Sequence, residues 1–424
     1  MSTIPSTASS ATTPSSPVPA LDQPLLRPTD LGDLRLPNRV VMAPATRARA
    51  ADADLVPTEM HVAYYSQRAG AGLIITEGTW VSERAVGFVN VPGVYSERQV
   101  RAWRRVTDVV HALGGRIVLQ LWHTGAASHP DHLGGRLPGG PSAVNPYERS
   151  FTPSGFKDTV TPRAMPLAEI ETTIADFGAA SENARRAGFD GVEVHALGPF
   201  LIPQFLNPRL NRRTDAYGGD RARRRRLLLD IIDAVAAPWD SRGVGVRLSP
   251  YWTSGAAGDS EASAASGASG ASGASGASVA SVASGGCFTA DETTLADYDE
   301  LVARLNDHPV DYLHLLGRRL PAPGATRDAT PDATPSAAPD IAAIARYRRL
   351  FDGPLIANLG FDRASGNAVV EAGIADAVSF ATHFIANPDL VTRFALGRKL
   401  ATGDPATYYT GGAAGYVDYP ASEW

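Results

Sequence analysis

The stretch GVEVHALGPFLIPQFLNPRLNRRTDAYGG, residues 191–219, decides our interpretation of the fold. Its first five residues have the alternating pattern of a short buried strand, which ends at His195. We expect the chain then to turn without forming a helix and to continue as a long polar loop that Gly218 and Gly219 close. An ionisable side chain at the carboxyl end of a strand, followed by an elaborate loop, is typical of the active-site face of a (β/α)8 barrel. A core histidine beside an ordinary loop is the alternative.

Short apolar runs alternate with longer helical patterns along the whole chain. We predict strands at residues 40–43, 73–77, 117–121, 192–195, 244–248, 312–316, 355–358 and 377–380. We predict helices at residues 59–69, 97–113, 167–187, 221–236, 291–306, 341–351, 363–372 and 388–397. Eight β–α units favour an α/β fold, and a single-domain (β/α)8 TIM barrel is the simplest way to close their parallel sheet. A doubly wound open sheet is the runner-up, but no GxGxxG motif follows the first strand.

Local signals mark the starts of two of these helices. Thr289 followed by Glu292 fits a capping box, in which two side chains satisfy the free N–H groups of the first turn. Pro388 fits the first turn of the last helix, where its missing N–H costs nothing. We therefore expect Thr289 to cap one helix and Pro388 to begin the other.

Three low-complexity stretches interrupt the pattern. Residues 1–22 are rich in Ser, Thr, Pro and Ala, and we expect a disordered N-terminal tail there. Residues 254–286 contain ASGASGASGAS and have the composition of a flexible linker, while residues 321–339 are rich in Pro, Ala and Thr. No boundary separates two cores, so we predict one domain over residues 23–424 that carries these two insertions.

Composition limits the class of protein. The chain has 424 residues, 44% of them hydrophobic and 20% charged, and a formal net charge of −5, so it gives no reason to expect nucleic acid or a membrane as partner. The single cysteine, Cys287, excludes an internal disulfide and suits a reducing compartment. The sequence shows no secretory signal and no apolar run long enough to span a bilayer, so we predict a cytoplasmic protein. We interpret RARRRR, residues 221–226, as a solvated helix face with salt bridges.

The predicted strand ends carry residues that would meet at one mouth of a barrel. They are Pro44, Ala45, Thr46, Gly78, Gln120, Trp122, His195, Arg247, Leu359, Gly360, Ala381 and Thr382. An amide, a hydroxyl and an arginine can hydrogen-bond a flat heterocycle and stabilise negative charge on it. The loops after the last two strands are the usual phosphate seat of this fold. We therefore expect flavin mononucleotide (FMN) rather than a metal, because the sequence shows no cluster with metal-ligand spacing.

Several longer motifs follow one another along the chain: NRVVMAPATRARA (38–50), GLIITEG (72–78), QLWHTG (120–125), NRRTDAYGG (211–219), GVRLSP (245–250), ADAVSF (375–380), FIANPDL (384–390) and GGAAGYVDYP (411–420). On these motifs, the sequence resembles the old yellow enzyme family, the FMN-dependent ene-reductases, from about Leu21 to the C-terminus. The resemblance implies a barrel enzyme that takes hydride from NADPH or NADH and passes it through FMN to an activated alkene conjugated to a carbonyl group.

The resemblance also assigns roles by position. Thr46 would contact the flavin carbonyl, and Pro44, Ala45 and Gly78 would line the flavin ring. Gln120 and Arg247 would hydrogen-bond the pyrimidine end of the ring. Phe88, Trp122 and Tyr409 would border the substrate, His195 would bind the substrate oxygen, and Leu359, Gly360, Ala381 and Thr382 would lie at the phosphate.

Two regions depart from the family pattern. Where the family has a second oxygen-binding residue and a proton-donating tyrosine, this chain has Gly198 and Phe200. Tyr64, Tyr251 and Tyr409 are the alternative proton donors that the sequence offers. At the phosphate end, the family's Gly-Gly is Leu359-Gly360 and its Gly-Arg is Ala381-Thr382. Leu and Ala adopt positive φ poorly, and the missing arginine removes a charge-assisted contact.

Three hypotheses follow from these patterns. The leading one is an FMN-dependent oxidoreductase that reduces activated alkenes, with His195 as the remaining donor to the substrate oxygen. The second keeps the flavin but makes the protein an alkene isomerase, because Phe200 supplies no proton. The third is a weakly flavin-binding or non-catalytic relative of the family. The departures at the substrate-binding residues and at the phosphate-binding turns motivate it.

Overall fold

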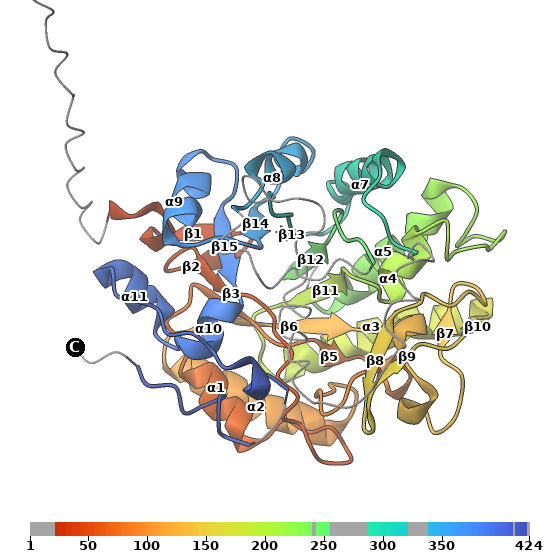
Figure 1. Ribbon diagram of the computed structural model, residues 1–424, viewed down its shortest axis with the longest axis horizontal. Coiled ribbons are helices and arrows are strands. Elements are labelled where there is room, and N and C mark those ends of the chain that lie inside the picture. Colours follow the sequence, from red (N-terminus) through yellow and green to blue (C-terminus); the bar gives the residue numbers. More distant parts are fainter. Residues whose placement is uncertain (1–21, 240–242, 255–286, 321–337, 410–411, 422–424) are drawn as a thin grey trace, which may run out of the picture.

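The architecture is a closed ring of eight parallel strands with helices around it (Figure 1). This computed structural model describes residues 22–239, 243–254, 287–320, 338–409 and 412–421. The barrel strands are β3 (Val40–Met42), β4 (Leu73–Ile75), β6 (Ile117–Trp122), β11 (Val192–Ala196), β12 (Val244–Leu248), β13 (Tyr312–Leu316), β14 (Leu355–Asn358) and β15 (Ala377–Phe380). Parallel pairing of β15 with β3 and of β6 with β11 closes the ring, so the open-sheet alternative is wrong.

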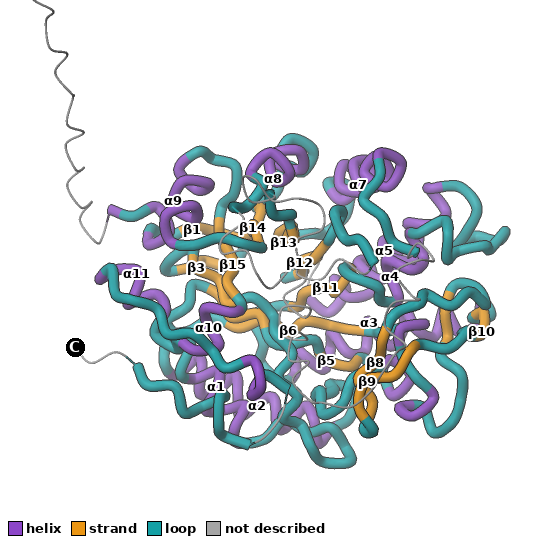
Figure 2. Tube along the Cα trace, viewed as in Figure 1, coloured by secondary structure: helices purple, strands orange, loops and turns teal. Residues whose placement is uncertain are grey.

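Helices follow the strands and cover the outside of the ring, as Figure 2 shows in purple around the orange strands. They are α1 (Glu59–Ser66), α2 (Glu97–Ala112), α3 (Leu167–Arg186), α4 (Leu201–Leu206), α5 (Arg221–Ala236), α7 (Glu292–Leu305), α8 (Ile341–Arg348), α9 (Arg363–Glu371), α10 (Thr382–Ala386) and α11 (Leu390–Leu396). A short strand, β5 (Thr79–Trp80), follows β4 and pairs in parallel with β6 in the barrel sheet. Small strands lie outside this sheet: β1 (Thr29–Leu31), β2 (Leu34–Leu36), β7 (Gly139–Gly140), β8 (Arg149–Thr152), β9 (Gly155–Asp158) and β10 (Arg163–Ala164).

All eight predicted strands and all eight predicted helices are present. The strands at 244–248, 312–316, 355–358 and 377–380 and the helix at 221–236 have the predicted bounds, and the others differ by one to three residues at an end. The periodicity was strong because each strand is buried on both faces and each helix buries one stripe. The predicted tail and nearly all of both predicted insertions lie outside the described residues.

Three local predictions were wrong. The chain after His195 does form a short helix, α4, because Gln204 anchors it by donating hydrogen bonds to the carbonyls of Thr124 and Pro199. Asp291, not Thr289, caps α7, since its carboxylate accepts the N–H of Thr294. A carboxylate at that position also favours the positive end of the helix dipole. Pro388 precedes α11, whose first residue is Leu390.

The barrel interior is layered from apolar at one end to polar at the other. At the closed end, the β1–β2 hairpin places Leu31 and Leu36 in a cluster with inward side chains such as Val41 and Ile75. One layer higher, Gly245 is required because a Cβ there would lie 2.1 Å from the ring of Tyr312. Above that layer, inward positions carry polar side chains. A barrel whose base is filled in this way leaves its other end for a ligand.

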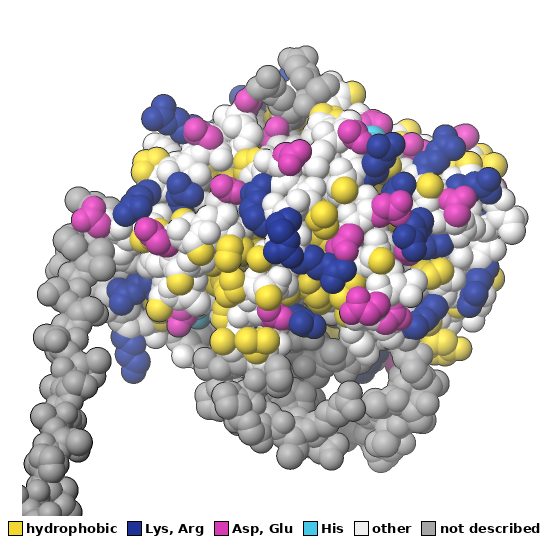
Figure 3. All heavy atoms as spheres, turned by 90° about the horizontal axis from the view of Figure 1, so that it is seen from above, with side chains coloured by type: hydrophobic (Ala, Val, Ile, Leu, Met, Phe, Trp, Pro, Cys, Tyr) yellow, Lys and Arg dark blue, Asp and Glu magenta, His cyan; other side chains and the backbone are white. Residues whose placement is uncertain are grey.

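The arginine-rich run on α5 is an ion-paired helix face, which confirms the prediction. Arg221 and Arg224 both pair with Asp297 of α7, and Arg221 also pairs with Glu300. Figure 3 shows basic and acidic side chains interspersed on the face that it presents. Among the described residues, no helix has the length and apolar character needed to cross a membrane.

Candidate active site

The structure brings the predicted strand-end residues to the carboxyl end of one barrel. Pro44, Gly78, Gln120, Trp122, His195, Gly198, Arg247, Leu359 and Ala381 are buried, Ala45, Thr46, Phe88, Phe200, Gly360 and Tyr409 are half-buried, and Thr382 is exposed. The strand register sets which side chains are neighbours. His195 lies beside Arg247 on the adjacent strand, and Glu193 lies beside Gln120.

Four aromatic rings form a wall at this mouth. Trp80 stacks on Trp122 with ring centroids 4.4 Å apart, and Trp122 stacks on His195 at 5.3 Å. Phe200 meets the edge of both, 4.8 Å from Trp122 and 5.2 Å from His195. Burial and the nearby charge of Arg247 lower the pKa of His195 to about 3. His195 is therefore neutral at physiological pH and carries one ring N–H that can donate to an oxygen.

A polar network lies directly beneath this wall. Gln120 Nε2 donates to Glu193 Oε1 at 2.8 Å, and His314 Nδ1 lies 2.8 Å from Glu193 Oε2. His314 Nε2 continues to Ser379 Oγ at 2.8 Å. On the neighbouring side, Arg247 Nη2 donates to Asn358 Oδ1 at 2.9 Å. The network fixes the side chains of Gln120 and Arg247 from below.

Gly78 provides space against this wall. A Cβ at Gly78 would lie 2.6 Å from the Trp122 ring and 3.4 Å from Gln120 Oε1. Any larger residue would therefore block the approach to both side chains. The mouth combines a flat open edge, an amide oxygen and a guanidinium, and this set fits the pyrimidine end of a flavin ring.

Glu77 joins the ends of the first two barrel strands. Its Oε2 accepts the backbone N–H of Arg47 at 3.3 Å, and its own N–H donates to the Tyr65 hydroxyl at 3.0 Å. Complete burial raises the pKa of Glu77 to about 7. Since Thr46 precedes Arg47 and Gly78 follows Glu77, this contact holds the two predicted flavin-facing segments together.

Phe88 and Tyr409 form a second aromatic group with Phe151. The ring centroid of Phe88 lies 5.2 Å from that of Phe151 and 5.3 Å from that of Tyr409. Tyr409 reaches this place because two buried arginines that follow β3 hold the C-terminal segment. Arg47 donates to the carbonyls of Tyr408 and Gly415, and Arg49 donates to Tyr408 at 2.7 Å and to Thr407 at 2.7 Å.

The turn after β14, where the resemblance places the flavin phosphate, contains two residues with positive φ. Leu359 has φ +87° and Gly360 has φ +79°, so the leucine holds a conformation that side chains other than glycine rarely adopt. Ala381 has ordinary right-handed helical geometry and precedes α10. A Cβ at Gly360 would lie 3.1 Å from Arg319 Nε, which places the side chain of Arg319 against this turn.

Sequence reasoning missed Glu193, His314 and Arg319. Glu193 and His314 are charged or polar residues inside otherwise apolar strand patterns, and the inward parity of their positions was a usable signal. Arg319 lies three residues after the end of β13, next to a low-complexity stretch, and no local pattern marks it. The arginines Arg47 and Arg49 lie inside a quoted motif, but nothing local shows that they reach the C-terminal segment.

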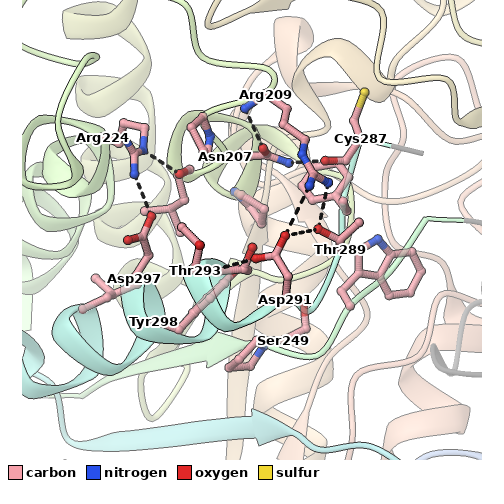
Figure 4. A pocket seen from close by; sticks show the side chains of 18 of the residues that line it. Asn207, Arg209, Arg224, Ser249, Cys287, Thr289, Asp291, Thr293, Asp297 and Tyr298 are labelled. Atoms are coloured by element: carbon pink, nitrogen blue, oxygen red, sulfur yellow. Dashed lines mark hydrogen bonds and ion pairs between the residues drawn. The ribbon is translucent and has the colours of Figure 1, made fainter. Parts of the chain in front are cut away.

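A cavity of about 220 Å³ lies beside this mouth, between α4, α5 and α7 (Figure 4). Gly198 and Ser249 form its inner edge, where the Gly198 N–H donates to Ser249 Oγ at 2.9 Å. Its arginines are already matched with acids, since Arg209 pairs with Asp291 at 3.2 Å and Arg224 with Asp297 at 2.6 Å. Of the predicted site residues, only Gly198 lines this ion-paired cavity.

These observations define an FMN-dependent oxidoreductase on a (β/α)8 barrel. The chain belongs to the NADH:flavin oxidoreductase / NADH oxidase family, whose model matches residues 24–307. The expected family, fold and cofactor class are thereby confirmed, and the chain is an enzyme of this family.

The individual relatives extend over nearly the whole chain. The chain is 36% identical over 404 residues to 12-oxophytodienoate reductase 1 from Oryza sativa subsp. japonica, covering 94% of this chain and 93% of the relative. It is 33% identical over 410 residues to flavin oxidoreductase hxnT from Emericella nidulans, covering 95% and 98%. Among solved structures, morphinone reductase superposes with a TM-score of 0.78 at 38% identity, covering 94% and 96%. A morphinone reductase complex with tetrahydroNAD gives 0.77.

Arg47 provides the first test, because the C-terminal segment depends on it. The substitution Arg47→Met removes the donor to the Gly415 carbonyl and one of the two arginine donors to the Tyr408 carbonyl, and it should lower the free energy of unfolding by about 2 kcal/mol or more. Hydrogen exchange should rise most in residues 412–420. Arg27→Met is the control, since Arg27 is an exposed partner of Glu371 at 3.8 Å. Unchanged exchange in Arg47→Met would show that other contacts hold the segment.

Proposed function

We propose that the protein uses NADPH or NADH and FMN to reduce the carbon–carbon double bond of a small molecule in which the bond is conjugated to a carbonyl group. The observation that carries this proposal is the neutral, buried His195 stacked on Trp122 beside Arg247. Two similar proteins are named as reductases of 12-oxophytodienoate and of morphinone, and both names denote carbonyl compounds. A tetrahydroNAD complex of one of them supports a nicotinamide hydride donor.

In this proposal, the chain positions the reactants and stabilises charge. Bound FMN supplies hydride transfer. The N–H of neutral His195 donates to the substrate carbonyl oxygen and stabilises the negative charge that develops there. Arg247 and Gln120 hold the pyrimidine end of the ring, and the Trp122 wall excludes water from one side. Thr46, Pro44, Ala45 and Gly78 line the ring itself.

The structure separates the three tyrosines that the sequence offered as proton donors. Tyr64 accepts a hydrogen bond from Arg47 at 3.2 Å inside the core, and the Tyr251 hydroxyl donates to the carbonyl of Ala343 at 3.2 Å. Tyr409 lies against Phe88, the residue expected to border the substrate, with ring centroids 5.3 Å apart. Burial raises the pKa of Tyr409, so its hydroxyl keeps its proton. Tyr409 is therefore the proton donor that we propose.

A second candidate function rests on Phe200. Its ring meets His195 edge-on at 5.2 Å, at the position where a tyrosine hydroxyl would reach the substrate. A phenyl ring donates no proton, so hydride that is added to one carbon can be withdrawn again before protonation. When the hydrogen that returns to the flavin as hydride is not the one that was added, the product is an isomer of the alkene, the flavin is reduced again and no NADPH is consumed.

The main test uses the purified protein with FMN, NADPH or NADH, and 2-cyclohexenone under anaerobic conditions. We expect a yellow protein and saturation of the ring double bond. His195→Ala should lower kcat/KM by roughly 100-fold or more with FMN still bound, because it removes one oxyanion donor. His111→Ala, which alters an exposed histidine paired with Asp190, is the control. A colourless protein that takes up no added FMN would exclude both candidate functions.

Phe200→Tyr distinguishes the two candidates. Placing a hydroxyl at this ring should raise the rate of saturation by about 10-fold or more, since a positioned general acid contributes roughly 100-fold to 10,000-fold. The same substitution should lower the rate of isomer exchange that occurs without net NADPH consumption. Product analysis by gas chromatography measures both rates. A Phe200→Tyr variant with unaltered rates would mean that proton transfer already proceeds elsewhere, and Tyr409→Phe would then stop it.

Arg319 is the residue that we propose for the phosphate of FMN in place of the arginine absent at Thr382. Arg319→Gln should weaken FMN binding by roughly 10-fold, as expected for one charge-assisted contact, and leave riboflavin binding unchanged. Fluorescence quenching of each flavin gives the two dissociation constants. Arg318→Gln is the matched control, because Arg318 pairs with Asp340 at 2.6 Å. If Arg319→Gln lowered the affinity for FMN and for riboflavin by the same factor, the assignment would be contradicted.

A further inference from the structure

The polar layer inside the barrel contains a carboxyl–imidazole pair that is shielded from solvent. The side chains of Glu193 and His314 are both fully buried, and their atoms are 2.8 Å apart. Such pairs lose much of their solvation, and apolar side chains of the same size often stabilise a fold as well or better. Stability alone therefore gives little reason for a buried carboxylate directly below Gln120.

The carboxylate determines which end of the Gln120 amide faces the ligand. An ionised carboxylate only accepts hydrogen bonds, and Gln120 Nε2 is bound to Glu193 Oε1 at 2.8 Å. The amide oxygen must then face the other way, and it lies on the side of Gly78. Rotating the amide by half a turn would bring two acceptors together at hydrogen-bond distance, with no water to separate them.

Other contacts keep Glu193 ionised. Burial raises the pKa of the carboxyl group, but the contact with His314 and the charge of Arg247 outweigh burial, so the pKa lies below its ordinary value. His314 is held in turn by Ser379 on its other nitrogen. Glu193, His314 and their partners Gln120, Arg247 and Ser379 come from five different strands, so the barrel itself sets their spacing.

We propose that Glu193 is a positioning residue that locks Gln120 as a hydrogen-bond acceptor and so selects a ring with an N–H at its edge. The inference rests on the proposed flavin function. The pyrimidine end of a flavin has one N–H between two carbonyl oxygens. Gln120 Oε1 accepts from that N–H, while Arg247 donates to a neighbouring carbonyl oxygen.

The experiment compares FMN with 3-deaza-FMN, in which a carbon replaces the ring nitrogen that carries this N–H. Dissociation constants are measured by fluorescence quenching on flavin-free protein refilled with each compound. The wild-type protein should bind 3-deaza-FMN about 10-fold more weakly than FMN, as expected for one hydrogen bond. In Glu193→Gln the amide of Gln120 can turn, and the ratio of the two constants should fall below about threefold.

Two further variants separate positioning from structure. Ser379→Ala keeps Glu193 and should keep the wild-type ratio. Glu193→Asp keeps the charge beside His314 but withdraws the acceptor from Gln120, so it should show the low ratio even where Glu193→Gln fails to fold. If Glu193 had only a structural role, its substitution would weaken the binding of FMN and of 3-deaza-FMN by the same factor.

The outcomes distinguish this inference from the proposed function. If the wild-type protein binds neither compound, the flavin function itself is wrong. If it binds FMN and discriminates, but both Glu193 variants retain the wild-type ratio, flavin binding stands and the positioning role of Glu193 is overturned. A low ratio in both Glu193 variants, with Ser379→Ala unchanged, supports the role.

Discussion

The register between β6, β11 and β12 is the constraint on which the rest of the site depends. Glu193 pairs with Gln120 on one side and with Gly245 on the other, and two residues later His195 pairs with Arg247. Because side chains alternate between the two faces of a strand, a slip by one residue would turn all of these groups out of the barrel. Gly245 supports this register, since only glycine leaves room for the Tyr312 ring.

Most of the fold was predictable from periodicity. Strands buried on both faces give short apolar runs, and Val244–Leu248 and its three successors were recognised with the correct bounds for that reason. The placement of the site followed from the fold, because His195 and Arg247 end their strands at the same face. Periodicity did not predict the short helix α4, because that helix depends on contacts with other parts of the chain. The helix α4 is short, and Gln204 bonds to residues of other loops to hold it.

The contacts that the sequence hid are long-range ones. Arg47 and Arg49 belong to a recognisable motif, but their partners lie more than 350 residues away and are backbone carbonyls, which leave no sequence signal. Glu193 and His314 are 121 residues apart, and only the closed ring brings them together. Arg319 meets Gly360 because β13 and β14 are adjacent strands. Each of these contacts requires the three-dimensional arrangement before a role can be assigned.

The two departures from the family pattern differ in physical kind. At the turn after β14, Leu359 adopts a positive φ, so the backbone there carries strain that a glycine would avoid. At the catalytic end, Phe200 keeps the ring but loses the hydroxyl, so the packing against His195 and Trp122 survives while a proton source is lost. Arg319, which lies against the turn at Gly360, and Tyr409, which lies against Phe88, both come from segments outside the barrel strands. The two groups that we propose for the phosphate and for proton transfer therefore belong to loops, whereas the residues proposed to hold the ring belong to the barrel mouth.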